Sequence, residues 1–160
     1  MKITTLFIIL IALFAIGFHQ EAKAEIVVLP KYGFQIDPLD APTSNATGQV
    51  IIMFLPSKNS FSANVNVQIQ PYSEGIKNYT ALTKGQFKQA GLKVISEKQI
   101  NDNEWICEYS GDLRGLSLHW YARAIFRENK IYLVTATALN QDWNEDSISL
   151  KKCVDSFKMK

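Results

Sequence analysis

The sequence has few residues of the kinds on which metal sites and catalytic centres depend. It contains two histidines and two cysteines among 160 residues, and His19 lies in an N-terminal segment that we expect to be removed. A zinc site would need both cysteines, His119 and a carboxylate to converge. A nucleophilic arrangement would need His119 beside one particular serine or cysteine. We therefore expect no metal, no cofactor and no catalytic residues.

The chain also lacks the common cofactor motifs and any concentration of charge. No P-loop, glycine-rich dinucleotide fingerprint or His-Glu-x-x-His element occurs in it. The net charge is +2 and the longest basic cluster is Lys151-Lys152, so we expect no nucleic-acid partner. Asp142, Glu145 and Asp146 lie close together but lack the spacing and glycine of a calcium loop. They are typical of the first turn of a helix, where acidic residues complement the helix dipole.

One long apolar run is present, at the N-terminus. Lys2 precedes the run Leu6–Phe18, and Ala22-Lys23-Ala24 has small residues at the positions that a signal peptidase recognises. The run is shorter than the ~20 residues that a membrane-crossing helix needs. The pattern predicts a secretory signal peptide over residues 1–24, cleaved after Ala24. We therefore expect a periplasmic or secreted protein with no membrane span after cleavage and a single domain over residues 25–160.

Hydrophobic periodicity predicts an antiparallel sheet. Alternation with period two is clearest in Ala63–Gln70, where Val65, Val67 and Ile69 alternate with asparagine and glutamine. That polar row is expected to form a solvated face. Further strands, several of them joined by short polar links typical of hairpins, are expected at Tyr32–Ile36, Val50–Leu55, Leu92–Ile100, Glu104–Ser110, Leu116–Arg127 and Lys130–Leu139.

Two segments have helical periodicity. The first ends at Gly91, which is typical of a left-handed C-terminal cap. The second begins at Ser147 and ends at Phe157. The apolar stripes are Ile76, Tyr79, Leu82 or Thr83, Phe87 and Ala90 in the first, and Ile148, Leu150, Cys153 or Val154, and Phe157 in the second. The order β-β-β-α-β-β-β-β-α predicts an α+β domain, a twisted antiparallel sheet flanked by α-helices.

Pairing Glu104–Ser110 with Leu116–Arg127 indicates which side chains share a face. A turn over residues 112–115 places Glu108 opposite His119, Glu104 opposite Arg123 and Ile106 opposite Tyr121. Trp105, Cys107 and Trp120 then lie on the other face, which we assign to the core. The first face combines charge pairs with apolar side chains that a helix, a partner or the segment Glu25–Pro30 must cover. The candidate binding face comprises Ile106, Glu108, His119, Tyr121, Arg123 and Ile125.

The two cysteines are a candidate disulfide. Export places thiols where they are oxidised, and two cysteines allow one connectivity. Cys107 shares a face with Trp105, and Cys153 lies on a helical stripe with Leu150, so both are expected in the layer between helix and sheet. We predict a Cys107–Cys153 bond, and the alternative is two separately buried thiols.

The order of elements and several local patterns resemble the PsbP-like fold. The patterns are Tyr32-Gly33-Phe34, Phe54-Leu55-Pro56, Asn64-Val65-Asn66-Val67, the junction from Tyr79 through Phe87 to Gly91-Leu92-Lys93-Val94-Ile95, and a last helix ending Ser156-Phe157. This family includes the extrinsic subunit PsbP of photosystem II, the Ran-binding factor Mog and bacterial envelope proteins of unknown function. The resemblance implies an α/β/α sandwich that binds proteins or assists assembly, with no shared catalytic residues. No Ran-binding or photosystem-specific segment is present, so neither partner is implied.

The expected function is that of an exported, non-enzymatic binding or assembly-factor domain for an envelope protein partner. One alternative is a small hydrolase centred on His119 with Glu108 and Tyr121. Another is a carrier of a small apolar ligand between sheet and helix. The substitution His119→Ala separates the first two, because a binding domain should keep its fold and its partner.

Overall fold

The computed structural model describes residues 27–29, 34–36 and 48–159. Strands β1 (Val27–Leu29) and β2 (Phe34–Ile36) pair antiparallel, and this hairpin and the residues from Gly48 onward belong to two different compact units. The predicted signal peptide and its cleavage site lie outside the described residues. Within the described part of the chain, no helix is long and apolar enough to cross a membrane.

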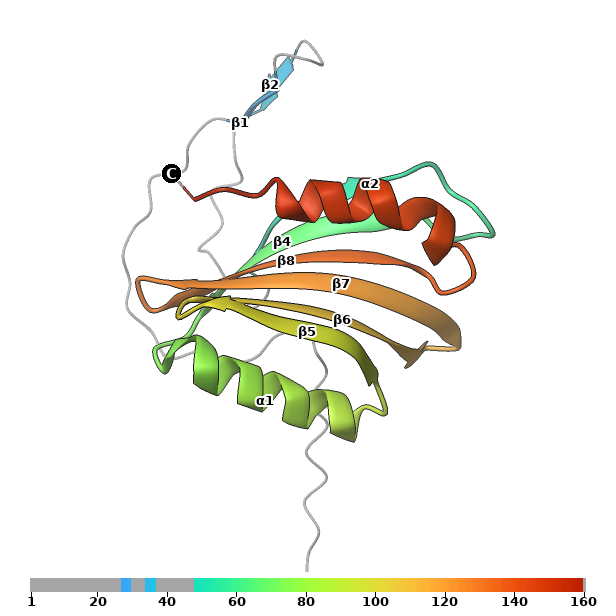
Figure 1. Cartoon of the computed structure of the whole chain (residues 1–160). Coiled ribbons are helices and arrows are strands. Elements are labelled where there is room, and N and C mark those ends of the chain that lie inside the picture. The colour runs from blue at the N-terminus through green and yellow to red at the C-terminus, as the bar shows by residue number, and fades with distance from the viewer. Residues whose placement is uncertain (1–26, 30–33, 37–47, 160) are drawn as a thin grey trace, which may run out of the picture. The chain divides into compact units, whose positions relative to one another are not determined.

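The larger unit is built on a six-stranded antiparallel sheet with the order β3-β4-β8-β7-β6-β5 (Figure 1). Each strand expected after residue 48 is present, with ends shifted by a few residues. The last four strands follow one another as hairpins, whereas β4 pairs with β8, far away in sequence. Strands β3 and β5 are therefore the two edges of the sheet. The strands are β3 (Gln49–Phe54), β4 (Asn64–Pro71), β5 (Lys93–Asn101), β6 (Glu104–Leu113), β7 (Leu116–Arg127) and β8 (Lys130–Leu139).

The two helices cover opposite faces of this sheet (Figure 1). Helix α1 (Gly75–Gln89) packs against β5, β6 and β7, and helix α2 (Trp143–Asp155) packs against β4, β7 and β8. The α+β class and the α/β/α sandwich expected from the sequence are confirmed. In α1 the buried stripe contains Thr83, and Leu82 is 50% exposed. Gly91 follows the helix with φ +70°, as the predicted cap requires.

Helix α2 begins four residues earlier than the sequence analysis expected. Asp142 is its N-cap residue but makes no side-chain hydrogen bond to the helix amides, and Glu145 and Asp146 lie in its first turn, where acidic residues were expected. The earlier start adds Trp143 to the buried stripe. Ile148, assigned to the stripe from the sequence, is 79% exposed. The buried residues of α2 are Trp143, Asp146, Leu150 and Val154.

Each face of the sheet has its own hydrophobic core. Under α1, Phe87, Tyr109 and Trp120 form a stack with ring centroids 4.2 and 5.0 Å apart. Side chains of the polar row on β4 lie on this face and are half-buried rather than fully solvated. The core under α2 is assembled from small and β-branched strand residues below Trp143, Leu150 and Val154.

The predicted disulfide is wrong, and the two faces explain why. Cys107 is fully buried in the core under α1, Cys153 packs at the margin of the core under α2, and both thiols are free. Each cysteine lies in a helix–sheet layer as predicted. Because the helices cover opposite faces, the sheet separates the thiols.

The register of β6 and β7 differs from the predicted one by two residues. Glu108 pairs with Tyr121, Ser110 with His119, and Leu113 with Leu116. The turn contains only Arg114 and Gly115, whose φ angles of 52° and 80° are typical of a two-residue type I′ hairpin. The predicted loop of four residues was too long. An even shift leaves every side chain on its predicted face.

Candidate functional site

The six residues of the candidate binding face all lie on the sheet face that α2 occupies. They alternate along β6 and β7 with the residues of the α1-side core, as the sequence pattern required. All six are buried or half-buried, so they do not form an open surface. Of its apolar members, Tyr121 packs against the core under α2.

Glu108 is the centre of the polar contacts between α2 and the sheet. Its Oε1 accepts hydrogen bonds from His119 Nε2 at 2.9 Å and from Trp143 Nε1 at 3.0 Å. Its Oε2 accepts one from Lys151 Nζ at 2.8 Å. Burial by itself would raise the pKa of Glu108, but the hydrogen bonds from Lys151, His119 and Trp143 and the charge of Lys151 outweigh it and lower the pKa. Glu108 therefore remains a carboxylate under the helix.

Both ring nitrogens and one ring face of His119 are in contact with neighbouring side chains. It is 7% exposed, and its ring stacks on Trp143 with centroids 4.0 Å apart and planes 13° apart. Its Nε2 bonds Glu108, and its Nδ1 lies 3.2 Å from Asn140 Oδ1. The hydrogen-bond partners are a carboxylate and an amide, and little of the ring is left for a substrate to contact.

Arg123 and Tyr121 fix the C-terminal end of α2. Arg123 donates to Glu104 Oε1 at 2.7 Å and to the backbone oxygens of Asp155 and Phe157 at 3.2 and 3.0 Å. Such donors satisfy carbonyls that a helix end leaves free. Tyr121 donates to Asp155 Oδ1 at 3.0 Å, and burial, reinforced by Asp155, raises the pKa of Tyr121 to about 12.

The predicted neighbours Glu108–His119 and Glu104–Arg123 are thus in contact, although the predicted register was wrong. Long side chains two residues out of register still reach one another diagonally across an antiparallel pair. Four residues of this face, Glu108, His119, Tyr121 and Arg123, attach α2 to the sheet. The position of this face under a helix could not be inferred from the strand pattern, because the pattern does not say which face the last helix covers.

The acidic residues at the start of α2 bind the loop between β3 and β4. Lys58 Nζ lies 2.7 Å from Glu145 Oε1 and 3.0 Å from Asp146 Oδ1, and these hydrogen bonds raise the pKa of Lys58. Asn59 Nδ2 donates to both carboxylate oxygens of Asp142. The positive charge that Glu145 and Asp146 pair with is therefore that of Lys58. No group of three potential metal-binding side chains occurs among the residues that the structure describes.

Among the described residues, a continuous run of exposed apolar side chains lies on β3, which sequence reasoning predicted as a strand but not as a site. Five consecutive large apolar side chains, Val50–Phe54, are between 38% and 64% exposed. They project alternately to both faces of the edge strand. The uncharged run Val50–Leu55 was the one sequence feature that could have indicated an exposed apolar site. A run of this kind, however, is typical of a buried strand as well.

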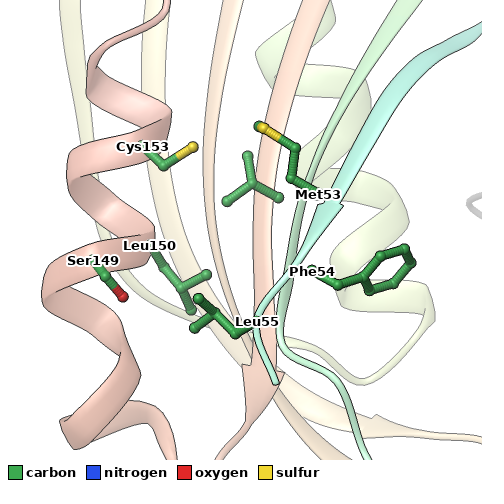
Figure 2. A pocket seen from close by; sticks show the side chains of 7 residues that line it. Met53, Phe54, Leu55, Ser149, Leu150 and Cys153 are labelled. Carbon is green, nitrogen blue, oxygen red and sulfur yellow. The ribbon is translucent and has the colours of Figure 1, made fainter. Parts of the chain in front are cut away.

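An apolar groove lies between β3 and α2 (Figure 2). It encloses a hollow of about 80 Å³. The sulfur atoms of Met53 and Cys153 point toward one another from opposite walls, whereas the ring of Phe54 points away from α2. The lining residues are Met53, Phe54, Leu55, Val65, Ser149, Leu150 and Cys153. Among these, Ser149 alone carries a hydroxyl group.

Comparison with known proteins identifies the fold. Neither a family model nor a curated protein matches the sequence. A protein of unknown function from Pseudomonas aeruginosa matches with a TM-score of 0.63 and 16% identity over 87% of this chain and 99% of that chain. PsbP from the cyanobacterium Synechocystis matches with a TM-score of 0.45 and 13% identity over 92% of this chain and 99% of that one. The chain therefore shares its fold with the Pseudomonas protein.

Proposed function

We propose that the protein is an exported, non-enzymatic binding domain that holds an apolar segment of an envelope protein partner in the groove between β3 and α2. The observation that carries this proposal is the exposed apolar strand β3 beside an apolar groove. Contiguous apolar surface of this kind on a soluble domain marks an interaction site. The export pattern in residues 1–24 supports an envelope partner.

The size of the groove favours a polypeptide over a small molecule. A hollow of about 80 Å³ is smaller than the ~150 Å³ cavity that holds a benzene molecule. Two of its lining residues, Met53 and Phe54, are exposed, so side chains of a partner can reach it while the partner's backbone remains outside. This supports the binding domain over the carrier of a small apolar ligand.

The geometry around His119 supports a binding function over a hydrolase. Glu108, His119 and Tyr121, the residues of that alternative, contact one another, α2 or its flanking residues. Their side chains are used to attach the helix that forms one wall of the groove. The polar groups of these three side chains therefore serve to hold the binding surface in place.

Site-specific photo-crosslinking in cells tests the proposal. Ser149 lines the groove, whereas its neighbour Ile148 points to solvent, so the two positions on α2 form a matched pair. We expect a crosslinker at Ser149 to capture an apolar segment of an exported protein and one at Ile148 to capture none. A Ser149→Trp variant, which fills the groove, should lose binding of that segment to the purified protein. Equal crosslinking from both positions, or binding unaffected by Ser149→Trp, would overturn the proposal.

A further inference from the structure

The two edges of the sheet differ in their protection against pairing. Edge strands of soluble proteins carry charges, prolines or bulges that prevent another strand from adding to them. Strand β5 has Lys93, Glu97 and Lys98, together with two register irregularities. Strand β3 has no charged residue and one irregularity, before Ile51. Within the part of the chain that the structure describes, the β3 edge from Ile51 to Leu55 is regular and apolar and has no strand paired with it.

The outward backbone groups of β3 can be identified from its pairing with β4. Leu55 N donates to Ala63 O at 2.7 Å, and the register continues through Phe54–Asn64 to Ile51–Val67. In an antiparallel strand, alternate residues direct both N–H and C=O to the same side. Leu55, Met53 and Ile51 therefore face β4. The N–H and C=O groups of Ile52 and Phe54 are directed to the open edge.

We infer that this edge pairs with β3 of a second copy of the chain. The two-fold axis passes beside Met53, so that Ile52 of each copy lies opposite Phe54 of the other. Each of these pairs uses the outward N–H and C=O groups and exchanges two hydrogen bonds. The pairing joins the two sheets into one continuous sheet. It goes beyond the proposed function, because its hydrogen bonds use the backbone edge of β3, whereas the proposed function uses the side chains that line the groove beside α2.

The chemistry of the strand favours a second copy as the occupant. In this register Ile51 meets Leu55, Ile52 meets Phe54, and Met53 meets its own symmetry mate. Every cross-strand pair is apolar, and pairs of this type stabilise a sheet. A two-fold interface brings each residue close to its own equivalent, so a charged residue near the axis would be repelled by its mate. Residues 49–55 contain no charge.

Sedimentation of the purified protein tests the pairing with matched variants. Ile52→Pro removes an outward N–H without removing a bond to β4, and Ile52→Lys places a charge at the edge. Ile100→Lys on β5 is the control, because Ile100 is 41% and Ile52 is 38% exposed. We expect a dimer whose dissociation constant rises at least about tenfold in both Ile52 variants and does not change in the control. Circular dichroism verifies that the variants fold.

Cysteine crosslinking tests the register. Two Met53 residues at the axis would have Cα atoms about 4.5 Å apart, within the range that a disulfide bridges. In a Cys153→Ser background, Met53→Cys should give a disulfide-linked dimer. Val50→Cys should not, although Val50 is 64% exposed, because its mate would lie roughly 20 Å away.

Three results would overturn the inference. The first is a monomer at every concentration at which the protein is soluble. The second is a dimer that neither Ile52 variant weakens. The third is a monomer in which the Ile52 amide is protected from hydrogen exchange, since the chain's own residues would then cover the edge. A dimer without crosslinking from Ser149 would leave the pairing supported and refute only the proposed function.

Discussion

Glu108 links three different groups to the sheet through one carboxylate. His119, Trp143 and Lys151 all donate to it, and its side chain is 14% exposed. A buried carboxylate of this kind is stabilised only while its donors are in place, and the donors likewise depend on it. The docking of α2 is therefore most sensitive to substitution at this residue.

Glu108→Gln should lower the free energy of unfolding by about 2–3 kcal/mol, because it leaves Lys151 without a counter-charge and gives His119 and Trp143 a weaker acceptor. Urea denaturation measures the change. Glu145→Gln is the matched control, since Glu145 also pairs with a lysine but is 74% exposed, and exposed pairs contribute little. Equal losses in the two variants would contradict a central function of Glu108.

Stability should also depend on pH through Glu108. Its pKa is lower in the folded protein than its ordinary value of 4.5, so the folded state favours the carboxylate. The resulting stabilisation is present above pH 4.5 and is lost as the pH falls through the lowered folded pKa. We expect wild type to have a higher urea midpoint than Glu108→Gln above pH 4.5 and this difference to shrink as the pH falls below 4.5. A difference that does not change with pH would refute this expectation.

Helix α2 shows what the sequence determines about an element and what it leaves open. Alternation assigned Cys107 and His119 to opposite faces of the sheet correctly, because the side-chain period of a strand is fixed by its backbone. The stripe with Leu150 identified a buried helix face. Neither pattern specifies which of two apolar sheet faces a helix covers, and that choice depends on packing between distant elements. The sequence-based disulfide failed for this reason.

The predicted register of β6 and β7 was wrong for a different reason. Arg114 adopts a positive φ of 52° beside Gly115, which non-glycine residues adopt rarely. The sequence therefore suggested a longer turn. The exposure of β3 was unpredictable because edge position is a property of the whole strand order, and Val50–Phe54 is as apolar as a central strand.

The placement of the helices predicts different reactivity for the two thiols. Cys107 is fully buried, and burial raises its pKa to about 12, whereas Cys153 is partly exposed at the groove. In native protein, iodoacetamide should modify Cys153 and leave Cys107 unmodified until the protein unfolds. Mass spectrometry of tryptic peptides measures both. Equal modification in the native state, or a peptide joining the two cysteines, would contradict the observed arrangement.

For the whole molecule, the export expectation gives a direct prediction. If the leader is removed after Ala24, the intact mass of protein recovered from the cell envelope should correspond to Glu25–Lys160. A double variant that combines Ala22→Lys with Ala24→Lys should retain residues 1–24, because the signal peptidase requires small residues at these positions. Recovery of full-length wild-type protein in the membrane fraction would refute a cleaved leader.

The pairing of β4 with β8 has a consequence for how the chain folds. Asn64 lies beside Thr137, and Pro71 beside Lys130, so the contacts that complete the sheet have a large sequence separation. Such contacts form late, because a long loop must close before they can form. In a chain that emerges N-terminus first from a ribosome or a translocation channel, the β3–β4 hairpin has two open edges and an apolar surface until Lys130–Leu139 has emerged. The folding of this domain is therefore completed only when almost the whole polypeptide is available. Its most aggregation-prone segment, strand β3, emerges early and remains exposed until then.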